Sequence, residues 1–452
     1  MFEIIIIGGG AAGMMAAITA ARTGAKVTIL EQNKELGKKI RSTRNGRCNF
    51  TNLLQDAHCY HSSQSDFPFP VYQKFDLQAT LTFFEGIGIM PKDRDGYVYP
   101  YSDQATAVIA TLVAEMKRLG VYIKTETTCL SLSSIPISSI PSSKIDSFKV
   151  STLNKTQMLS PSNRSQAFSP SNKTQKTESS DKPWKVETNH GLLFADAIIC
   201  TTGSKASQVA GADGSGYEMA KALGHHIIPV LPALVPLVAE ETFFAGLAGI
   251  RFHGLVTLFV ENIAVAKDLG EIQFTKYGIS GIPVFQISRF ATVALAKCKK
   301  VKAELDLLPQ FSNEELVDLF TKRSLHFSQN LGTDFLIGIF PEKLAVQIIK
   351  MSRVPGQTFT INKEMIHRMV AIIKHFAVTI IGNKSFEQAQ ICVGGIDTSE
   401  VCPVTLESLL HPKLYFAGEV LDVDGICGGY NLQWAWSSGY VAGLASSQVS
   451  EA

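Results

Sequence analysis

The clearest chemical signature in the sequence is a set of spaced glycines, Gly8-x-Gly10-x-x-Gly13, followed by an acid, Glu31. The glycines follow the apolar run "FEIIII", and Glu31 ends a second apolar run, "KVTIL". In a strand, loop, helix, strand unit, Gly8 would make the tight turn, Gly10 would let backbone approach a pyrophosphate, and Gly13 would let helix and strand touch. Glu31 would bind ribose hydroxyls and repel a 2'-phosphate. The pattern predicts a dinucleotide site, with an empty glycine turn as the alternative.

A polar segment after the acid bears on which dinucleotide binds. Residues 37–52, "GKKIRSTRNGRCNFTN", form an expected loop that offers Lys38, Arg47, Asn49 and backbone amides as ligands. A simple NAD dehydrogenase is expected to enter its next helix soon after the acid, whereas FAD is long and needs additional contacts. The segment therefore favours FAD, and a solvated basic loop is the alternative.

A second glycine-rich segment, "GEVLDVDGICGGYNLQWAWSSG", lies near the end of the chain at 418–439. It follows the apolar run "LYFA", so we expect a strand to run into Gly418 and Glu419. Gly428 and Gly429 then open a helix expected to continue to about residue 449. The positive end of that helix would face a flavin ring and stabilise its anionic reduced form. We therefore expect the two ends of the chain to meet on one cofactor.

The pattern changes twice between these two segments. Residues 133–182 are rich in Ser, Thr, Asn and Lys and repeat "NKTQ", "NRSQ", "NKTQ" in step, which predicts a disordered loop between two strands. A buried strand, "ADAIIC", then runs into Gly203, a further point where backbone can approach a ligand. Only one G-x-G-x-x-G occurs, so no second nucleotide-binding domain is expected.

The next part of the chain alternates short strands, such as "LVTLFVEN" and "AVAKDLGEIQF", with helices. The helices are expected at about 312–327, 341–352 and 362–375. We interpret this part as an insert that shapes a substrate site, with a purely structural insert as the alternative. The predicted division is 1–205 for the first part of the cofactor domain, 206–388 for the insert and 389–452 for the second part.

Composition limits the remaining classes of function. With 42 basic and 40 acidic residues, the net charge of +2 gives no reason to expect nucleic acid or an anionic membrane as a partner. No apolar run reaches about 18 residues, and no signal peptide pattern opens the chain, so we expect a cytoplasmic protein. The 8 cysteines include no C-x-x-C pair, and no H-x-x-x-H or G-x-S-x-G occurs. No metal site and no hydrolase site are therefore predicted.

These features resemble a bacterial family of NAD(P)/FAD-dependent oxidoreductases, the aminoacetone oxidase family, which includes bile-acid enone reductase-like flavoproteins. "GRCNFTN", "GSGYEMAKALGH", "FTKYGISG" and above all "YFAGEVLDVDGICGGYNLQWAWSSGYVAG" carry the resemblance. It implies an α/β fold, with a discontinuous Rossmann-like FAD-binding domain of the glutathione-reductase type and an inserted domain that is β-barrel-like and helical.

The resemblance also implies which residues contact FAD. Cys129, expected to end the strand "VYIKTETTC", is implied to meet the adenine through its backbone. The implied contacts are Gly8, Gly10, Ala11, Ala12, Gly13, Glu31, Lys38, Gly46, Arg47, Cys48, Asn49, Cys129, Gly203, Glu419, Asp424, Gly429, Tyr430, Asn431 and Leu432.

The chain departs from the family pattern at three positions. Arg44 and Ser204 replace glycines, and Lys276 replaces a histidine of the insert. The last change leaves the catalytic residue unknown. Tyr277, Ser280 and Tyr430 are the nearest candidates for polar contact with a substrate.

The implied function is that of an FAD-dependent oxidoreductase that transfers hydride through flavin N5 to or from a small organic substrate. Reduction of a conjugated enone C=C bond is the sharper prediction. The reductant is either NAD(P)H, which would visit the flavin transiently, or another donor. The alternative is a flavin-binding module that senses redox state or assists RNA modification without turning over a metabolite.

Overall fold

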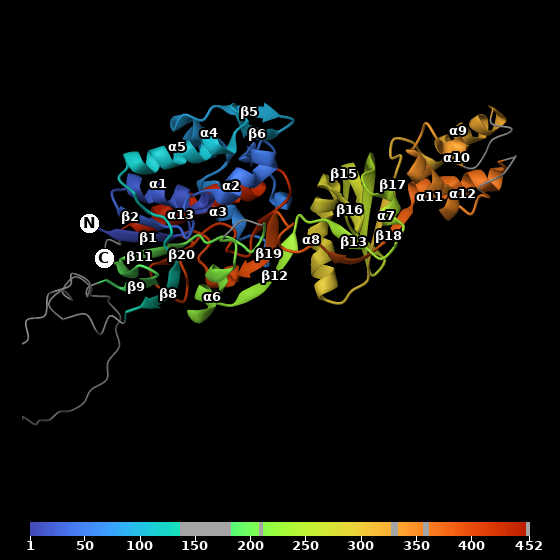
Figure 1. The fold of residues 1–452 in the computed structure, drawn as a ribbon. Helices are drawn as coiled ribbons and strands as arrows, with labels where there is room; N and C mark the ends of the chain where they lie inside the picture. Colours follow the sequence, from blue (N-terminus) through green and yellow to red (C-terminus); the bar gives the residue numbers. More distant parts are fainter. Residues whose placement is uncertain (136–181, 208–210, 327–332, 356–360, 449–452) are drawn as a thin grey trace, which may run out of the picture.

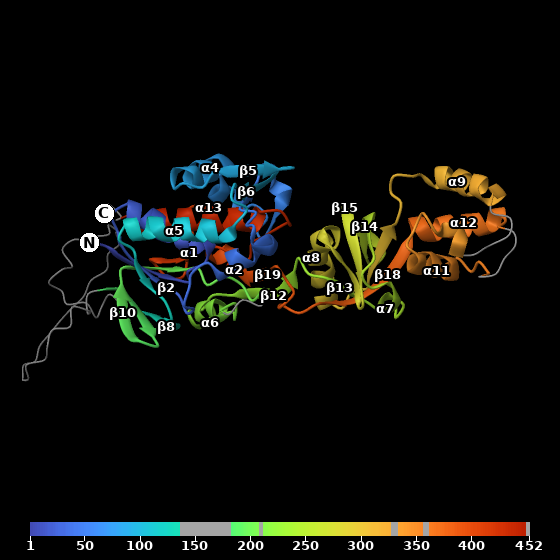
Figure 2. The ribbon, with the colours of Figure 1, turned by 45° about the horizontal axis from the view of Figure 1, so that its top comes forward.

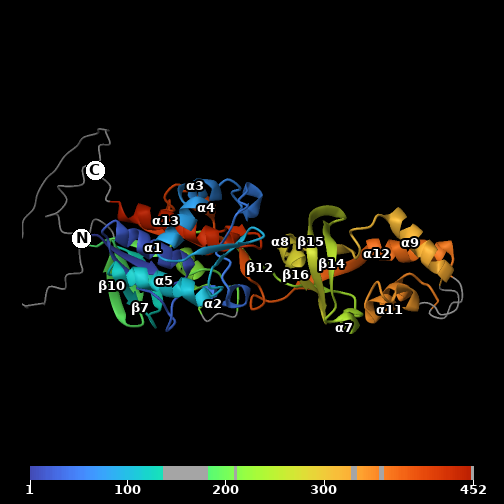
Figure 3. The same cartoon turned by 90° about the horizontal axis from the view of Figure 1, so that it is seen from above.

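The computed structural model describes residues 1–135, 182–207, 211–326, 333–355 and 361–448. The loop predicted at 133–182 lies almost wholly outside the described residues. Within them an α/β domain, a β-barrel and a group of helices follow one another along the long axis of the molecule, as Figures 1, 2 and 3 show. The predicted fold class is confirmed.

The α/β domain is built on a five-stranded sheet with all neighbouring strands parallel. Its strands are short and apolar, and the central one is buried from Ile4 to Ile7, because a parallel sheet is covered on both faces. Parallel strands place their carboxyl ends at one edge, so the loops after four of them meet there. In order across the sheet the strands are β20 (Leu414–Phe416), β11 (Ala197–Cys200), β1 (Glu3–Ile7), β2 (Lys26–Leu30) and β7 (Tyr122–Lys124).

The first and last helices of the described chain pack side by side. They are α1 (Ala11–Arg22) and α13 (Tyr430–Ser447), seen in blue and red in Figure 1. A Cβ at Gly439 would lie 2.4 Å from the Ala12 carbonyl oxygen, and one at Gly443 would lie 2.6 Å from the Ala16 carbonyl oxygen. Only glycine permits this approach, so the two ends of the chain meet as expected.

Further elements cover the domain and the sheet edges. The loop expected at 37–52 is partly helical, because the buried Ile40 anchors one turn after Gly37, whose φ is 70°. The elements are α2 (Lys38–Ser42), β3 (Thr51–Asn52), β4 (Tyr60–His61), α3 (Pro68–Lys74), α4 (Leu77–Gly86), β5 (Pro91–Arg94), β6 (Tyr97–Pro100), α5 (Ala105–Arg118), β8 (Cys129–Ser134), β9 (Trp184–Thr188), β10 (Gly191–Ala195), α6 (Ser215–Ala222) and β21 (Asp424–Gly425).

One expected strand is wrong. Cys129 begins β8, and the strand before it, β7, already stops at Lys124. Glu126 has a φ of 53°, which interrupts any strand, and its N–H bonds the Asn33 carbonyl oxygen at 3.0 Å. The chain thus turns around the end of β2 before Cys129.

The chain leaves the α/β domain along β12 (Ile227–Ala233) and returns along β19 (Ile391–Ile396), and these two strands pair antiparallel. Between them lies a closed antiparallel barrel that contains the expected strands "LVTLFVEN" and "AVAKDLGEIQF". The boundaries predicted at 205 and 388 stay predictions. In order around the barrel the strands are β13 (Leu237–Ala239), β16 (Gly278–Gly281), β15 (Ile263–Thr275), β14 (Arg251–Val260), β17 (Val301–Asp306) and β18 (Phe376–Asn383).

The helices of the insert extend the barrel core. The three helices predicted from periodicity are confirmed as α9 (Asn313–His326), α11 (Glu342–Met351) and α12 (Lys363–Lys374), with the short α10 (Thr333–Leu336) between the first two. Their apolar residues and those of the barrel form one cluster. Two further helices, α7 (Phe244–Leu247) and α8 (Ile282–Ala296), lie at the barrel itself. No described helix is both long enough and apolar enough to cross a membrane.

Candidate dinucleotide site

A cavity of about 530 Å³ lies along the carboxyl edge of the parallel sheet. Its walls come from the ends of four strands: residues 8–12 after β1, residues 31–33 after β2, residues 201–204 after β11 and residues 417–419 after β20. One end of the cavity reaches residues 427–429, where α13 begins. One cavity therefore joins the two glycine-rich segments.

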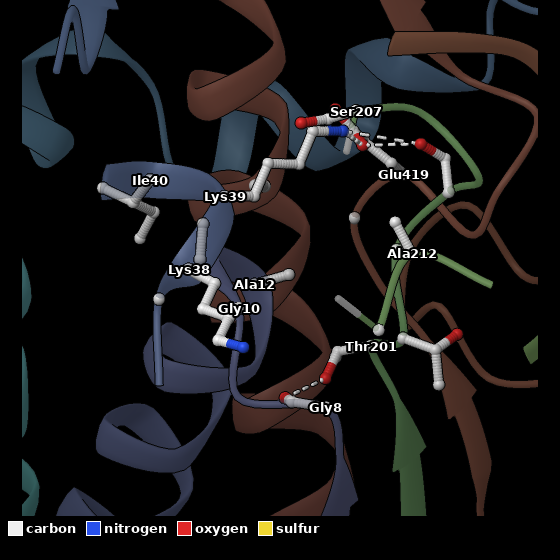
Figure 4. Close-up of a pocket in the computed structure, with 18 of the residues that line it drawn as sticks. Gly8, Gly10, Ala12, Lys38, Lys39, Ile40, Thr201, Ser207, Ala212 and Glu419 are labelled. Atoms are coloured by element: carbon white, nitrogen blue, oxygen red, sulfur yellow. Dashed lines mark hydrogen bonds and ion pairs between the residues drawn. The ribbon is translucent and has the colours of Figure 1, made fainter. Parts of the chain in front are cut away.

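The glycine loop has the steric surroundings that each predicted role requires. Gly8 has a φ of +106°, and a Cβ there would lie 2.5 Å from the Thr201 carbonyl oxygen. A Cβ at Gly13 would lie 1.9 Å from the Gly8 carbonyl oxygen, so helix and strand touch at that point. Gly10 has no atom within 4 Å of an added Cβ, which leaves its backbone open to a ligand. Thr201 Oγ1 donates to the Gly8 carbonyl oxygen at 2.8 Å (Figure 4), which fixes the loop.

The carboxylate of Glu31 is held at the mouth of this loop. It is 9% exposed and accepts the Gly9 N–H at 2.9 Å and the Asn33 N–H at 2.8 Å. Lys38 Nζ donates to the Asn33 side-chain oxygen at 2.8 Å. These contacts orient the carboxylate beside the cavity before any ligand binds. Sequence reasoning missed Asn33, which lies only two positions after the acid.

A charged pair also lines the cavity. Lys39 Nζ forms an ion pair with Glu419, and Ser204 Oγ donates to the same carboxylate at 3.0 Å. In Figure 4 Lys39 reaches Glu419, whereas Lys38 extends away from it. Sequence reasoning found Glu419 but not Lys39, because nothing in the sequence indicates that α2 faces the end of β20.

Asn49 shows most directly that the cavity is built for a polar ligand. The residue is 4% exposed and lines the cavity. Neither its Oδ1 nor its Nδ2 has a hydrogen-bond partner among the described residues. A buried amide left unpaired costs about 1–3 kcal/mol, so a ligand that bonds it gains affinity from this position. The open Gly10 and the unpaired Asn49 together fit a long dinucleotide such as FAD.

The structure brings most of the predicted contacts together and leaves six outside the cavity wall. Those that line the cavity are Gly8, Gly10, Ala11, Ala12, Glu31, Lys38, Asn49, Cys129, Gly203, Glu419, Gly429, Asn431 and Leu432. Those that lie outside the lining are Gly13, Gly46, Arg47, Cys48, Asp424 and Tyr430.

Three of the outlying residues have other surroundings. Burial raises the pKa of the Cys48 thiol to about 12, so this thiol is an inert core group. Tyr430 is 3% exposed, and its ring packs edge-on against that of Tyr60 at 6.0 Å. Asp424 is paired with Arg289, whose Nε lies 2.7 Å from a carboxylate oxygen, and burial raises the Asp424 pKa to about 7.

The other candidates for substrate contact lie in the insert. Tyr277 and Ser280 do not line this cavity. The carbonyl oxygen of Tyr277 accepts the Ala239 N–H at 2.8 Å, and Ser280 lies within β16 of the barrel wall. From the connection between the two parts of the molecule, the apolar Leu234, Ala389 and Ile391 line the cavity together with the polar Gln390.

One constellation resembles the triad of a hydrolase but has a structural role. His225 lies 2.9 Å from Glu400 through Nδ1 and 2.9 Å from Ser408 Oγ through Nε2. Ser408 Oγ already accepts the N–H groups of Leu410 and His411, and the histidine side chain is wholly buried. Neither His225 nor Ser408 lines the dinucleotide cavity. Among the described residues there is also no cluster of three metal-ligating side chains.

The fold and the site define the chain as an FAD-dependent oxidoreductase. It belongs to the family described as the HI0933-like protein Rossmann domain, whose model matches residues 2–160 and 161–445.

Three curated relatives match over nearly the whole chain. The 3-dehydro-bile acid delta(4,6)-reductase of Clostridium scindens is 38% identical over 99% of this chain and 100% of its own length. The ribosomal RNA dihydrouridine synthase of Haemophilus influenzae is 28% identical over 99% of this chain and 98% of its own. The protein of the same name from Escherichia coli is 26% identical over 97% and 96%.

Proposed function

We propose that the chain reduces a C=C bond conjugated to a carbonyl group in a small organic substrate, with NAD(P)H as the reductant. The observation that carries the proposal is the cavity, which is lined both by Glu31 and by Gly429 at the start of α13. It also contains the buried Asn49, whose amide has no hydrogen-bond partner among the residues that the structure describes. The substrate class is supported by the relative that is 38% identical over its full length and is named as a reductase of a 3-dehydro-bile acid.

The residues that line the cavity would hold FAD from end to end. Glu31 is oriented for ribose hydroxyls, and the open backbone at Gly10 lies at the start of α1 for the pyrophosphate. Glu419 and Asn49 would bond the ribityl chain and the ring. When bound, FAD supplies a ring that takes up and releases a hydride.

The start of α13 would stabilise the negative charge of a reduced ring. The helix runs from Tyr430 to Ser447, and Gly429 before it lines the cavity. Unpaired N–H groups and the positive end of the helix dipole therefore face the cavity end. No acidic side chain of the first turn opposes this charge.

The wall near α13 fits an apolar substrate. Leu234 directly follows β12 and Ile391 begins β19, the two strands that join the insert to the α/β domain, and both line the cavity beside Cys427. Apolar side chains here would exclude water and bury a hydrocarbon skeleton. We infer that the insert helps to shape the substrate site through Leu234, which lies within 206–388.

A second candidate is reduction of uridine in RNA. Two relatives, 28% and 26% identical, are named ribosomal RNA dihydrouridine synthases. Dihydrouridine is uridine with one ring C=C bond saturated, and that bond is conjugated to a carbonyl group, so the redox chemistry is of the same class. The higher identity to the bile-acid reductase ranks the small substrate first. The absence of a nucleic acid partner and the cytoplasmic location stay predictions.

An anaerobic titration tests the proposal. The purified flavoprotein is titrated with NADH and with NADPH while the flavin absorbance near 450 nm is followed, and an enone steroid, an isolated alkene steroid of the same skeleton or a uridine-containing ribosomal RNA fragment is then added. We expect bleaching by a nicotinamide and recovery of absorbance with the enone but not with the alkene. Recovery with RNA alone would replace the first candidate by the second. A protein that binds no FAD would refute both.

A further inference from the structure

Helix α8 of the insert is hydrogen-bonded to the segment from Asp424 to Gly429 that leads into α13. Gln286 Oε1 accepts the Cys427 N–H at 2.7 Å, and Gln286 Nε2 donates to the Cys427 carbonyl oxygen at 3.3 Å. One turn further along α8, Arg289 Nε donates to Asp424 at 2.7 Å. Positions three apart lie on one helix face, so a single face of α8 makes all these contacts.

The same segment is held from the other side by its own domain. The Asn431 side chain accepts the Gly425 N–H and donates to the Gly425 carbonyl oxygen, each at 2.8 Å. A Cβ at Gly429 would lie 2.6 Å from the Thr51 carbonyl oxygen. The backbone that lines the flavin end of the cavity is therefore fixed between the α/β domain and α8.

The contact between Arg289 and Asp424 is a buried charge pair. Asp424 is 2% exposed and the Arg289 side chain 19%. Asp424 Oδ1 has no hydrogen-bond partner among the described residues. A buried ion pair is seldom more stabilising than apolar side chains of the same volume, so its presence beside the segment calls for another explanation.

We propose that Gln286 and Arg289 are positioning residues by which the insert sets the backbone at 427–429 and, through the balanced charges of Arg289 and Asp424, the reduction potential of the flavin. The inference rests on the proposed function, because it requires FAD in the cavity. The reduction potential of the flavin then depends on how the insert packs against the α/β domain.

The charge part of the inference is tested by the midpoint potential of the bound flavin, measured anaerobically against reference dyes. At pH 8.5, above the Asp424 pKa of about 7, Asp424→Asn leaves the Arg289 cation unbalanced, so we expect reduced FAD to be favoured over oxidised FAD by roughly tenfold more than in the wild type. For a two-electron couple this is a rise of about 30 mV. The double variant with Arg289→Gln removes both charges, and we expect its potential to return to the wild-type value.

The double variant distinguishes an electrostatic effect of the charge pair from a loss of order in the segment. If the pair only holds the segment together, the double variant would be at least as perturbed as Asp424→Asn, and this result would overturn the inference. Glu271→Gln is the matched control, because it removes a carboxylate from the exposed pair with Arg251 in the barrel (2.8 Å) and should leave the potential unchanged. An equal shift in this control would also overturn it.

The positioning part is tested with Gln286→Ala, which removes both side-chain bonds to Cys427. We expect FAD to dissociate roughly tenfold more readily, and unchanged binding would contradict the role of Gln286. Wild-type protein that holds no flavin would refute the proposed function itself. Wild-type protein that holds flavin, with the same potential in Asp424→Asn, would refute only this inference.

Discussion

Alanine at Gly13 should lower the stability of the protein, whereas alanine at Gly10 should weaken FAD binding, although both residues belong to one motif. An added Cβ at Gly13 would overlap the Gly8 carbonyl oxygen at 1.9 Å and Thr201 Oγ1 at 2.7 Å. Overpacking of this kind costs about 1–3 kcal/mol, and displacement of Thr201 weakens its bonds to the Ile7 and Gly8 carbonyl oxygens, about 1 kcal/mol each. We therefore expect Gly13→Ala to lower the free energy of unfolding by about 3–5 kcal/mol, a large part of the usual total.

Gly10→Ala should leave the stability of the protein unchanged and weaken the binding of FAD. The residue has a φ of −79°, which alanine adopts without strain, and the added Cβ meets no atom within 4 Å. We expect the stability of the FAD-free protein to change by less than about 0.5 kcal/mol. The methyl group would stand where a pyrophosphate approaches the backbone, so the dissociation constant of FAD should rise at least about tenfold.

Tryptophan fluorescence during urea unfolding is a suitable assay of the domain concerned. All 3 tryptophans (Trp184, Trp434 and Trp436) lie in the apolar core of the α/β domain, so the signal does not report the insert. FAD affinity is measured separately by titrating the FAD-free protein. Equal losses of stability in the two variants, or wild-type FAD binding by Gly10→Ala, would refute the assigned roles.

Three further predictions concern single side chains. Asn49→Ala should weaken FAD binding by about 1–3 kcal/mol in calorimetry without lowering the stability of the FAD-free protein, because the amide has no hydrogen-bond partner in the ranges that the structure describes; a loss of stability instead would contradict this. Hydrogen bonds from Arg118, then Arg22, hold the pKa of Glu115 at about 2, below its ordinary 4.5, so its stabilisation is present above pH 4.5 and is lost as the pH falls through 2. Glu115→Gln should lower the free energy of unfolding at pH 7 by about 1–2 kcal/mol, because solvent screens the two exposed arginines. In urea unfolding at pH 2 the difference between variant and wild type should disappear. A difference that does not depend on pH would contradict its ionic origin. Burial, then Arg289, lowers the pKa of His61 to about 4. The contribution of the neutral histidine to the free energy of unfolding is therefore present above pH 6.5 and lost as the pH falls through 4. His61→Gln should flatten the dependence of the free energy of unfolding on pH over this interval.

The sequence alone determined the features whose contacts are local. The first strand, the glycine turn and α1 could be predicted because Gly8 and Gly13 meet within one short stretch of chain. The helices of the insert could be predicted because one apolar face repeats at helical spacing. The break before Cys129 was missed, since it depends on an Asn33 carbonyl that lies far back in the chain.

Only the tertiary structure decided which distant groups share the site. Lys39 and Glu419 are 380 positions apart, and they meet because both face the carboxyl edge of one parallel sheet. Within the described part of the chain Asn49 faces the cavity and has no hydrogen-bond partner, a fact that no local pattern contains. The hydrogen bonds between α8 and residues 424–429 likewise depend on how the insert packs against the α/β domain. Hydrophobic periodicity specifies which face of an element is buried, but the partner of that face is chosen by packing over the whole chain.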